Sequence, residues 1–233
     1  MRIIGIIGAL DAEVGLLKSR MDIISAKRIA GMDFFLAKHS GKSVVISRCR
    51  VGKVNAALCA QIMINMYGVD CIINTGVAGA LSPKLSIGDI VISCDLVQHD
   101  FDTTGVGDPP YQNPSIPESF FPADEELVRL AKTGCAKALM HGRSAHVGRI
   151  ATGDQFIMSR LHKDTIYKDL DALCVEMEGA AIAQACYLNE VAFVVIRAIS
   201  DKADDEAGVA FEHFVQEAAD ACAAIVEVMI GDF

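Results

Sequence analysis

The sequence has no tryptophan, and aromatic residues make up only 6% of its 233 residues. It also has no excess of basic residues, since 21 lysines and arginines stand against 30 acidic residues and give a net charge of −9. A protein that binds duplex nucleic acid needs a cationic surface. An anionic membrane also repels a chain of this charge. We therefore expect no nucleic-acid partner and no membrane partner, and the composition leaves open an enzyme or a small-molecule binding protein.

Metal-binding cysteine patterns are missing as well. The eight cysteines lie far apart, without a C-x-x-C pair or a cysteine–histidine combination of zinc-ligand spacing. Isolated thiols in a chain of this length are typical of small buried residues in a reducing compartment. We therefore expect a cytoplasmic protein that holds no metal.

No apolar run approaches the roughly 18 residues of a membrane-spanning helix. Residues 3–10 do resemble the apolar part of a secretory signal. However, only one positive charge, that of Arg2, precedes them, and the acidic residues Asp11 and Glu13 follow directly. We predict a first strand here instead.

The common nucleotide and hydrolase signatures are also absent. Residues 40–43 resemble the end of a P-loop, but Leu36 stands where the motif needs glycine. The glycines after the first predicted strand do not form G-x-G-x-x-G, and G-x-S-x-G and H-E-x-x-H do not occur. These absences disfavour an NAD-dependent dehydrogenase and the commonest hydrolase classes.

The chain does contain short β-branched runs that alternate with helical patterns, which is typical of β/α units. We predict an α/β fold: one three-layer α/β/α domain over residues 1–233 around a mixed, mostly parallel twisted sheet. The predicted strands are residues 2–8, 33–39, 43–50, 71–74, 88–97, 147–151, 172–176 and 192–199. The predicted helices are residues 12–20, 53–67, 124–139, 179–188 and 211–230, and residues 100–122 form a long loop.

Carboxylates follow several predicted strands, where ligands of open α/β sheets bind. Glu13 lies in the first turn of a helix, where it either complements the helix dipole or acts as an ionised base. Glu178 is either an acid at a helix N-terminus or a carboxylate that binds ligand hydroxyls. Asp201 is either a helix cap or a general acid, provided that burial and the acidic residues 204–206 raise its pKa.

Two other features remain open at this point. Phe156 and Phe211 either stack on a flat base or fill the core. His99, with Asp100 and Asp102, suggests a metal site or a dyad, and we prefer a hydrogen-bonded loop anchor.

Seven segments together resemble the 5′-methylthioadenosine/S-adenosylhomocysteine nucleosidases of the purine nucleoside phosphorylase superfamily. They are IIGIIGALDAE (3–13), VGKV (51–54), IINTGVAG (72–79), GDIVIS (88–93), TGDQFI (152–157), VEMEGAAIA (175–183) and FVVIRAISD (193–201). Because they span the chain in the family's order, the resemblance covers nearly all of it.

The resemblance implies hydrolysis of the N-glycosidic bond of 5′-methylthioadenosine and S-adenosylhomocysteine, by a homodimer that needs no cofactor. It makes Glu13 the base that activates water and Asp201 the acid that protonates N7 of adenine. It places the substrate-binding residues at Val51, Val77, Gly79, Phe156, Ile157, Met177, Glu178, Arg197, Ser200 and Phe211. Among these, Glu178 holds the ribose hydroxyls, and Arg197 and Ser200 support the acid.

Three departures from the family pattern concern the 5′ side of the substrate. Val77 replaces a serine, Thr103 and Val106 replace larger apolar residues, and the proline-rich residues 108–117 differ from the usual loop. Alternative substrates are therefore 5′-deoxyadenosine and aminofutalosine. A phosphate-dependent phosphorylase, with Arg48, Arg50 and Lys53 as anion ligands, and a non-catalytic nucleoside-binding protein are the rival functions.

Overall fold

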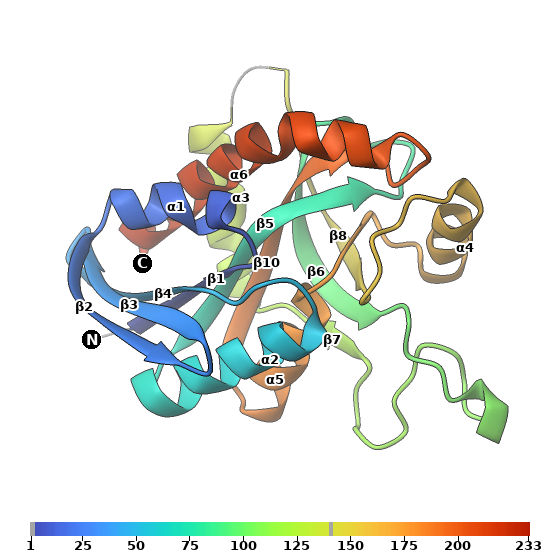
Figure 1. The fold of residues 1–233 in the computed structure, drawn as a ribbon, viewed down its shortest axis with the longest axis horizontal. Coiled ribbons are helices and arrows are strands. Elements are labelled where there is room, and N and C mark those ends of the chain that lie inside the picture. The colour runs from blue at the N-terminus through green and yellow to red at the C-terminus, as the bar shows by residue number, and fades with distance from the viewer. Residues whose placement is uncertain (1–2, 140–141) are drawn as a thin grey trace.

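A computed structural model describes residues 3–139 and 142–233. A ten-stranded mixed sheet lies between two layers of helices (Figure 1). Its strands are β1 (Ile3–Gly8), β2 (Asp22–Ile29), β3 (Met32–His39), β4 (Lys42–Arg48), β5 (Cys71–Ala80), β6 (Ile90–Gln98), β7 (Phe120–Pro122), β8 (Ala145–Thr152), β9 (Cys174–Glu176) and β10 (Ala192–Asp201). The α-helices are α1 (Asp11–Ser19), α2 (Lys53–Ile62), α3 (Glu125–Ala138), α4 (Arg160–Leu170), α5 (Gly179–Leu188) and α6 (Ala207–Asp232). The three-layer α/β prediction is confirmed.

The core lies on both faces of the sheet, because the central strands alternate apolar residues toward each helix layer. Ile72 and Val195 pack on the side of α2 and α5, whereas Ile73 and Ile196 pack on the side of α1, α3 and α6. All four side chains are fully buried. Among the described residues, no helix is long and apolar enough to cross a bilayer.

The strand order positions the functional loops. β5 pairs in parallel with β1 and with β10, so the carboxyl ends of these three strands meet at one edge. β10 also pairs with β6, β6 with β8, β8 with β9, and β9 with β5, which closes these strands into a ring. The ends of β8 and β9 therefore also arrive next to the end of β5.

The strand β2 and the helix α4 were not predicted, because their sequences lack a clear apolar face. The side chains of β2 are almost all exposed, and the strand pairs only with β3 at the sheet edge. In α4, only Ile166 and Leu170 are buried, and the Ser159 side chain caps the helix.

Other predicted boundaries differ from the structure. β5 extends to Ala80 because β10 and β9 pair with its glycine-rich end, where the prediction stopped at residue 74. The last helix begins at Ala207 instead of residue 211, and the predicted 100–122 loop contains a 3-10 turn (Thr104–Val106) and the short β7. A single domain over residues 1–233 stays a prediction.

Candidate active site

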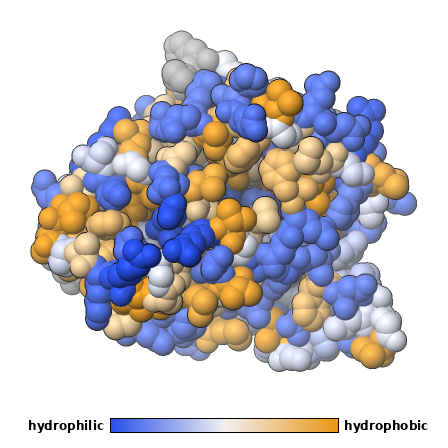
Figure 2. Space-filling view, in the orientation of Figure 1, coloured by the Kyte–Doolittle hydropathy of each residue, from blue (hydrophilic) through white to orange (hydrophobic). Residues whose placement is uncertain are grey.

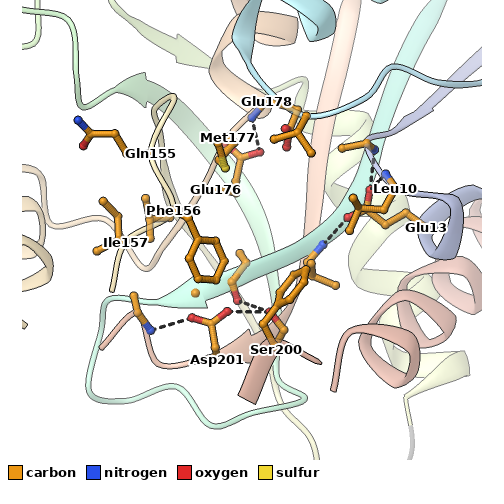
Figure 3. Close-up of a pocket in the computed structure, with 18 residues that line it drawn as sticks. Leu10, Glu13, Gln155, Phe156, Ile157, Glu176, Met177, Glu178, Ser200 and Asp201 are labelled. Atoms are coloured by element: carbon orange, nitrogen blue, oxygen red, sulfur yellow. Dashed lines mark hydrogen bonds between the residues drawn. The ribbon is translucent and has the colours of Figure 1, made fainter. Parts of the chain in front are cut away.

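A cavity of about 370 Å³ opens where β1, β5 and β10 end. Figure 3 shows Glu13 on one side of this cavity and Asp201 on another, with Phe156 close to Asp201 and with Met177 and Glu178 on a third side. The structure thus brings residues from both ends of the chain to one cleft. The predicted site residues that line it are Glu13, Val51, Val77, Gly79, Phe156, Ile157, Met177, Glu178, Ser200, Asp201 and Phe211.

Glu13 is buried at the start of α1, and backbone amides hold its carboxylate. One oxygen accepts the N–H groups of Ala9 (2.5 Å) and Leu10 (2.9 Å), and the other accepts that of Val77 (3.1 Å). Burial raises the pKa of Glu13, while Arg197 and the three amides act in the opposite direction. The sequence predicted that the helix dipole keeps Glu13 ionised; the net shift is upward instead, which makes the ionised carboxylate a stronger base.

The approach of Glu13 to β5 requires a glycine. A Cβ atom on Gly76 would overlap the Glu13 carboxylate, and one on Gly8 would come within 2.9 Å of the Glu13 Cβ. The glycines at the ends of β1 and β5 therefore provide the room for this acid.

Asp201 ends β10 and is also buried. A register shift between Ile199 and Asp201 sets the acid opposite Gly79, at which a Cβ atom would lie 2.7 Å from Asp201 Oδ1. The carboxylate accepts the N–H of Ala203 (2.8 Å) and the hydroxyl of Ser200 (2.9 Å). Burial raises the pKa of Asp201, these two hydrogen bonds oppose the rise, and Asp204 adds to it.

The start of the last helix excludes one of the two interpretations of Asp201. The helix α6 begins only at Ala207, with Glu206 at its N-cap, so Asp201 does not cap it. A buried carboxyl group with a raised pKa fits a general acid.

Glu176 and Glu178 have separate roles at the start of α5. The carboxylate of Glu176 accepts the N–H groups of Glu178 (3.0 Å) and Gly179 (2.8 Å), the Thr152 hydroxyl and the Arg197 guanidinium. Glu176 is therefore the acid that satisfies this helix N-terminus, and its other two partners, Thr152 and Arg197, come from separate strands.

The Glu178 carboxylate is left to face the cavity, where the N–H of Gly52 donates to it (2.8 Å). Burial and the nearby Glu176 raise the pKa of Glu178 to about 8, although Arg197 opposes this rise. An acid that does not cap the helix and faces the cavity fits the predicted binding of ligand hydroxyls.

Arg197 is placed differently from the prediction. It is buried, does not line the cavity, and donates to Glu176 and to Asn74 Oδ1 (2.6 Å). We expected it to support Asp201, but it is instead the counter-ion of Glu176, and Glu13 and Glu178 also act on its charge. Of the two residues expected to support the acid, Ser200 does donate a hydrogen bond to it.

The two aromatic residues lie together at the cavity. The rings of Phe156 and Phe211 make an edge-to-face contact with centroids 5.6 Å apart, and Phe156 is 45% exposed. They therefore do not fill the core, and their faces and edges are available to a flat ligand.

The candidate anion ligands are occupied by other groups. Arg48 pairs with Asp11, Arg50 donates to the Gly31 carbonyl (2.7 Å), and Lys53 pairs with Asp100 (2.5 Å). Arg48 and Arg50 line a separate groove beside the β3–β4 hairpin, where Figure 2 shows strongly hydrophilic side chains left of centre.

The proposed metal or dyad cluster does not assemble in the described residues. Asp100 is bound by Lys53, Asp102 accepts the N–H of Thr104 (2.8 Å), and no group of three potential ligands is arranged around a metal position there. The His99 backbone N–H donates to Thr152, and its ring is buried, so the residue anchors the loop.

The comparisons with known proteins agree with this geometry. The family model described as "Phosphorylase superfamily" matches residues 3–231. The chain is 41% identical over 228 residues to a 5′-methylthioadenosine/S-adenosylhomocysteine nucleosidase of Staphylococcus haemolyticus, covering 97% of this chain and 98% of that protein.

Solved structures are similar over the whole chain. The Neisseria meningitidis nucleosidase of the same name, in complex with methylthio-immucillin-A, has a TM-score of 0.95 and 35% identity, with 100% of both chains covered. A Helicobacter pylori protein described as futalosine hydrolase has a TM-score of 0.94 and 31% identity, covering 100% of this chain and 98% of that one.

Proposed function

This chain belongs to the phosphorylase superfamily, and on that premise we propose that it is a hydrolase of the N-glycosidic bond of 5′-methylthioadenosine and S-adenosylhomocysteine. The products are adenine and the 5-thioribose that carries the 5′ substituent. The observation that carries this proposal is the placement of Glu13, Glu178 and Asp201 on different sides of one cavity.

The acid acts on the base. Asp201 donates its proton to N7 of adenine while the bond between C1′ and N9 breaks, and the electron pair of that bond leaves with the adenine. Its raised pKa keeps the proton available. Phe156 and Phe211 bind the face of the base, and Ile157 lies at its edge.

The carboxylates on the other side act on the sugar and the water. Glu178 holds the ribose hydroxyls through hydrogen bonds to its carboxyl oxygen atoms. Water adds to C1′ from the face opposite adenine and gives its proton to Glu13, as in inverting glycoside hydrolysis. Each proton transfer contributes roughly 10²–10⁴-fold to the rate.

Hydrolysis is favoured over phosphorolysis by the occupied cations. Arg48, Arg50 and Lys53 each have a protein partner, and none of them lines the cavity. The anionic Glu13, where it is ionised, would also repel phosphate at the attacking position.

A second substrate class is favoured by one observation. Val77 lines the cavity and provides only its backbone N–H to Glu13, and the chain is similar to a futalosine hydrolase. We therefore propose aminofutalosine as the alternative substrate.

The test is a panel of adenine nucleosides that differ only in the 5′ substituent, assayed for free adenine in phosphate-free buffer. We expect release from 5′-methylthioadenosine and S-adenosylhomocysteine without phosphate. Strict dependence on phosphate, with a ribose 1-phosphate product, would contradict hydrolysis. Faster release from aminofutalosine than from both thioethers would assign the alternative substrate.

We also propose a homodimer. Apolar side chains are exposed on α2 and next to it, and α2 begins directly beside the cavity. They are Val51, Val54, Leu58, Met66 and Leu188, which we call the α2 face. For the cellular location we propose the cytoplasm, because the cysteines lie far apart in the sequence and seven of the eight are buried.

A further inference from the structure

We propose that Asp100 is a positioning residue that fixes the distance between the base-binding and ribose-binding sides of the cavity. This inference rests on the proposed function. Together with Lys53 and Asp154, Asp100 forms a group of bonded residues that we call the clamp. None of these three residues lines the cavity, and the resemblance to the nucleosidases assigned no role to Asp100 or Asp154.

The clamp ties three loops together. One Asp100 oxygen accepts Lys53 Nζ (2.5 Å), and the other accepts the N–H of Asp154 (2.9 Å). Asp154 returns a bond, because its Oδ1 accepts the N–H of Lys53 (2.8 Å). Lys53 Nζ also donates to Gln98 Oε1 (3.0 Å) at the end of β6.

Two of the three clamped loops continue directly into the cavity wall. Asp154 precedes Gln155, Phe156 and Ile157, which line the base side. Lys53 follows Gly52, whose N–H holds the Glu178 carboxylate. The clamp therefore fastens the base-side loop to the segment that orients the acid on the ribose side.

The environment of the clamp makes these bonds effective. The Lys53 and Asp100 side chains are only 18% and 17% exposed, so water screens their charges weakly. Burial alone would raise the pKa of Asp100, but the bonds from Lys53 and Asp154 outweigh it and lower that pKa. The carboxylate thus stays ionised and accepts both bonds.

Two glycines next to the clamp show how closely its loops are packed. A Cβ atom on Gly52 would lie 3.2 Å from Asp154 Oδ1, and one on Gly153 would overlap the buried His99 ring. The loops are therefore packed as closely as glycine permits at both ends of the clamp.

The test replaces Asp100 by Asn and Lys53 by Met, separately and together. Asn keeps the size of the side chain but provides a single acceptor oxygen, so one bond is lost. A nucleoside touches both sides of the cavity, whereas adenine touches one. We therefore expect KM for 5′-methylthioadenosine to rise by about tenfold or more, with the Kd for adenine, from calorimetry, changed by less than about threefold.

Three controls make the outcome decisive. Asp102→Asn removes a neighbouring exposed carboxylate that bonds only Thr104, and it should leave KM unchanged. The double variant should lose no more than the worse single variant, because the residues act as one unit. Thermal unfolding measures folding separately.

An unchanged KM in Asp100→Asn would overturn the proposal. So would equal weakening of adenine and nucleoside binding, since that result describes general loss of structure. Failure of the proposed function would look different. The unaltered protein would then release no adenine from the nucleosides, although calorimetry could still measure its binding of adenine.

Discussion

At the scale of single residues, the candidate site depends on acids that the fold keeps away from water. Burial is the largest cause of the raised pKa of both Glu13 and Asp201. A raised pKa favours the protonated form of a carboxyl group and makes its ionised form a stronger base, so both groups are suited to proton transfer. The hydrogen bonds to Asp201 come from its own neighbours in the chain, Ser200 and Ala203, so the acid and its support move as one segment.

The first prediction concerns Asp201→Asn. Asparagine can keep the bonds to Ala203 and Ser200, but it cannot donate a proton to N7. We expect turnover to fall by roughly 10²–10⁴-fold, with nucleoside binding nearly unchanged, as measured by single-turnover kinetics and calorimetry. Asp205→Asn, at an exposed position close by, is the matched control.

The same variant should not be less stable at neutral pH. A carboxyl group whose pKa is raised on folding stabilises the fold below its unfolded pKa and loses that contribution as pH rises through its folded pKa. Asparagine does not ionise, so its burial carries no such cost at neutral pH.

For the kinetic prediction, turnover of Asp201→Asn equal to that of the unaltered protein would remove Asp201 from the mechanism.

Sequence reasoning located the acids that follow strands, since Glu13, Glu178 and Asp201 all line the cavity. Their proposed chemical roles stay predictions. The bonds of Glu176 to Thr152 and Arg197 were not predicted, because they join residues from separate strands and no local pattern encodes such contacts. For the same reason, Arg197 was assigned to the wrong acid.

At the scale of elements, the junction of β9 and α5 is organised by one buried ion pair. Glu176 and Arg197 are each about 2% exposed at the side chain, and Glu176 also satisfies the first amides of α5. The loss of one partner would leave a buried charge without compensation.

We therefore predict that Glu176→Gln lowers the free energy of unfolding by about 3 kcal/mol or more, as measured by urea denaturation. Glutamine has the same shape but removes the carboxylate that pairs directly with Arg197. Glu190→Gln, an exposed acid just after α5, should change it by less than about 0.5 kcal/mol. A loss below about 1 kcal/mol in Glu176→Gln would show that the pair contributes little net stability.

Elements with strong apolar patterns were predicted from sequence, and those without them were not. The two-sided burial of β5 and β10 is visible as continuous apolar runs. By contrast, the Gly76–Ala80 end of β5 looks like a loop in sequence, and it becomes strand only because β9 and β10 pair with it. The edge strand β2 buries too little surface to leave an apolar pattern.

At the scale of the whole molecule, closure of β5, β10, β6, β8 and β9 into a ring brings distant segments to one cleft. Sequence order does not reveal that β10 pairs with β5 and β6 at once, since such pairings depend on the assembled sheet. The position of the α2 face beside the same cleft leads to a prediction about assembly.

Replacing Val54 and Leu58 together by Glu should convert the proposed dimer into monomers, as measured by sedimentation. The two side chains are 71% and 47% exposed, so the folded monomer tolerates the charges, whereas a covered interface does not. Leu161→Glu, on the exposed side of α4, is the control. An unchanged oligomeric state in the α2 variant would contradict the placement of the interface.

The eight thiols described above are unevenly accessible, and this has a practical consequence. Seven of them are buried, and only Cys94, on the outer side of β6 and apart from the cleft, is exposed. A maleimide dye should therefore attach at one place on the native protein. The unaltered chain already carries a single attachment point for fluorescence or for surface immobilisation, without engineering of its cysteines.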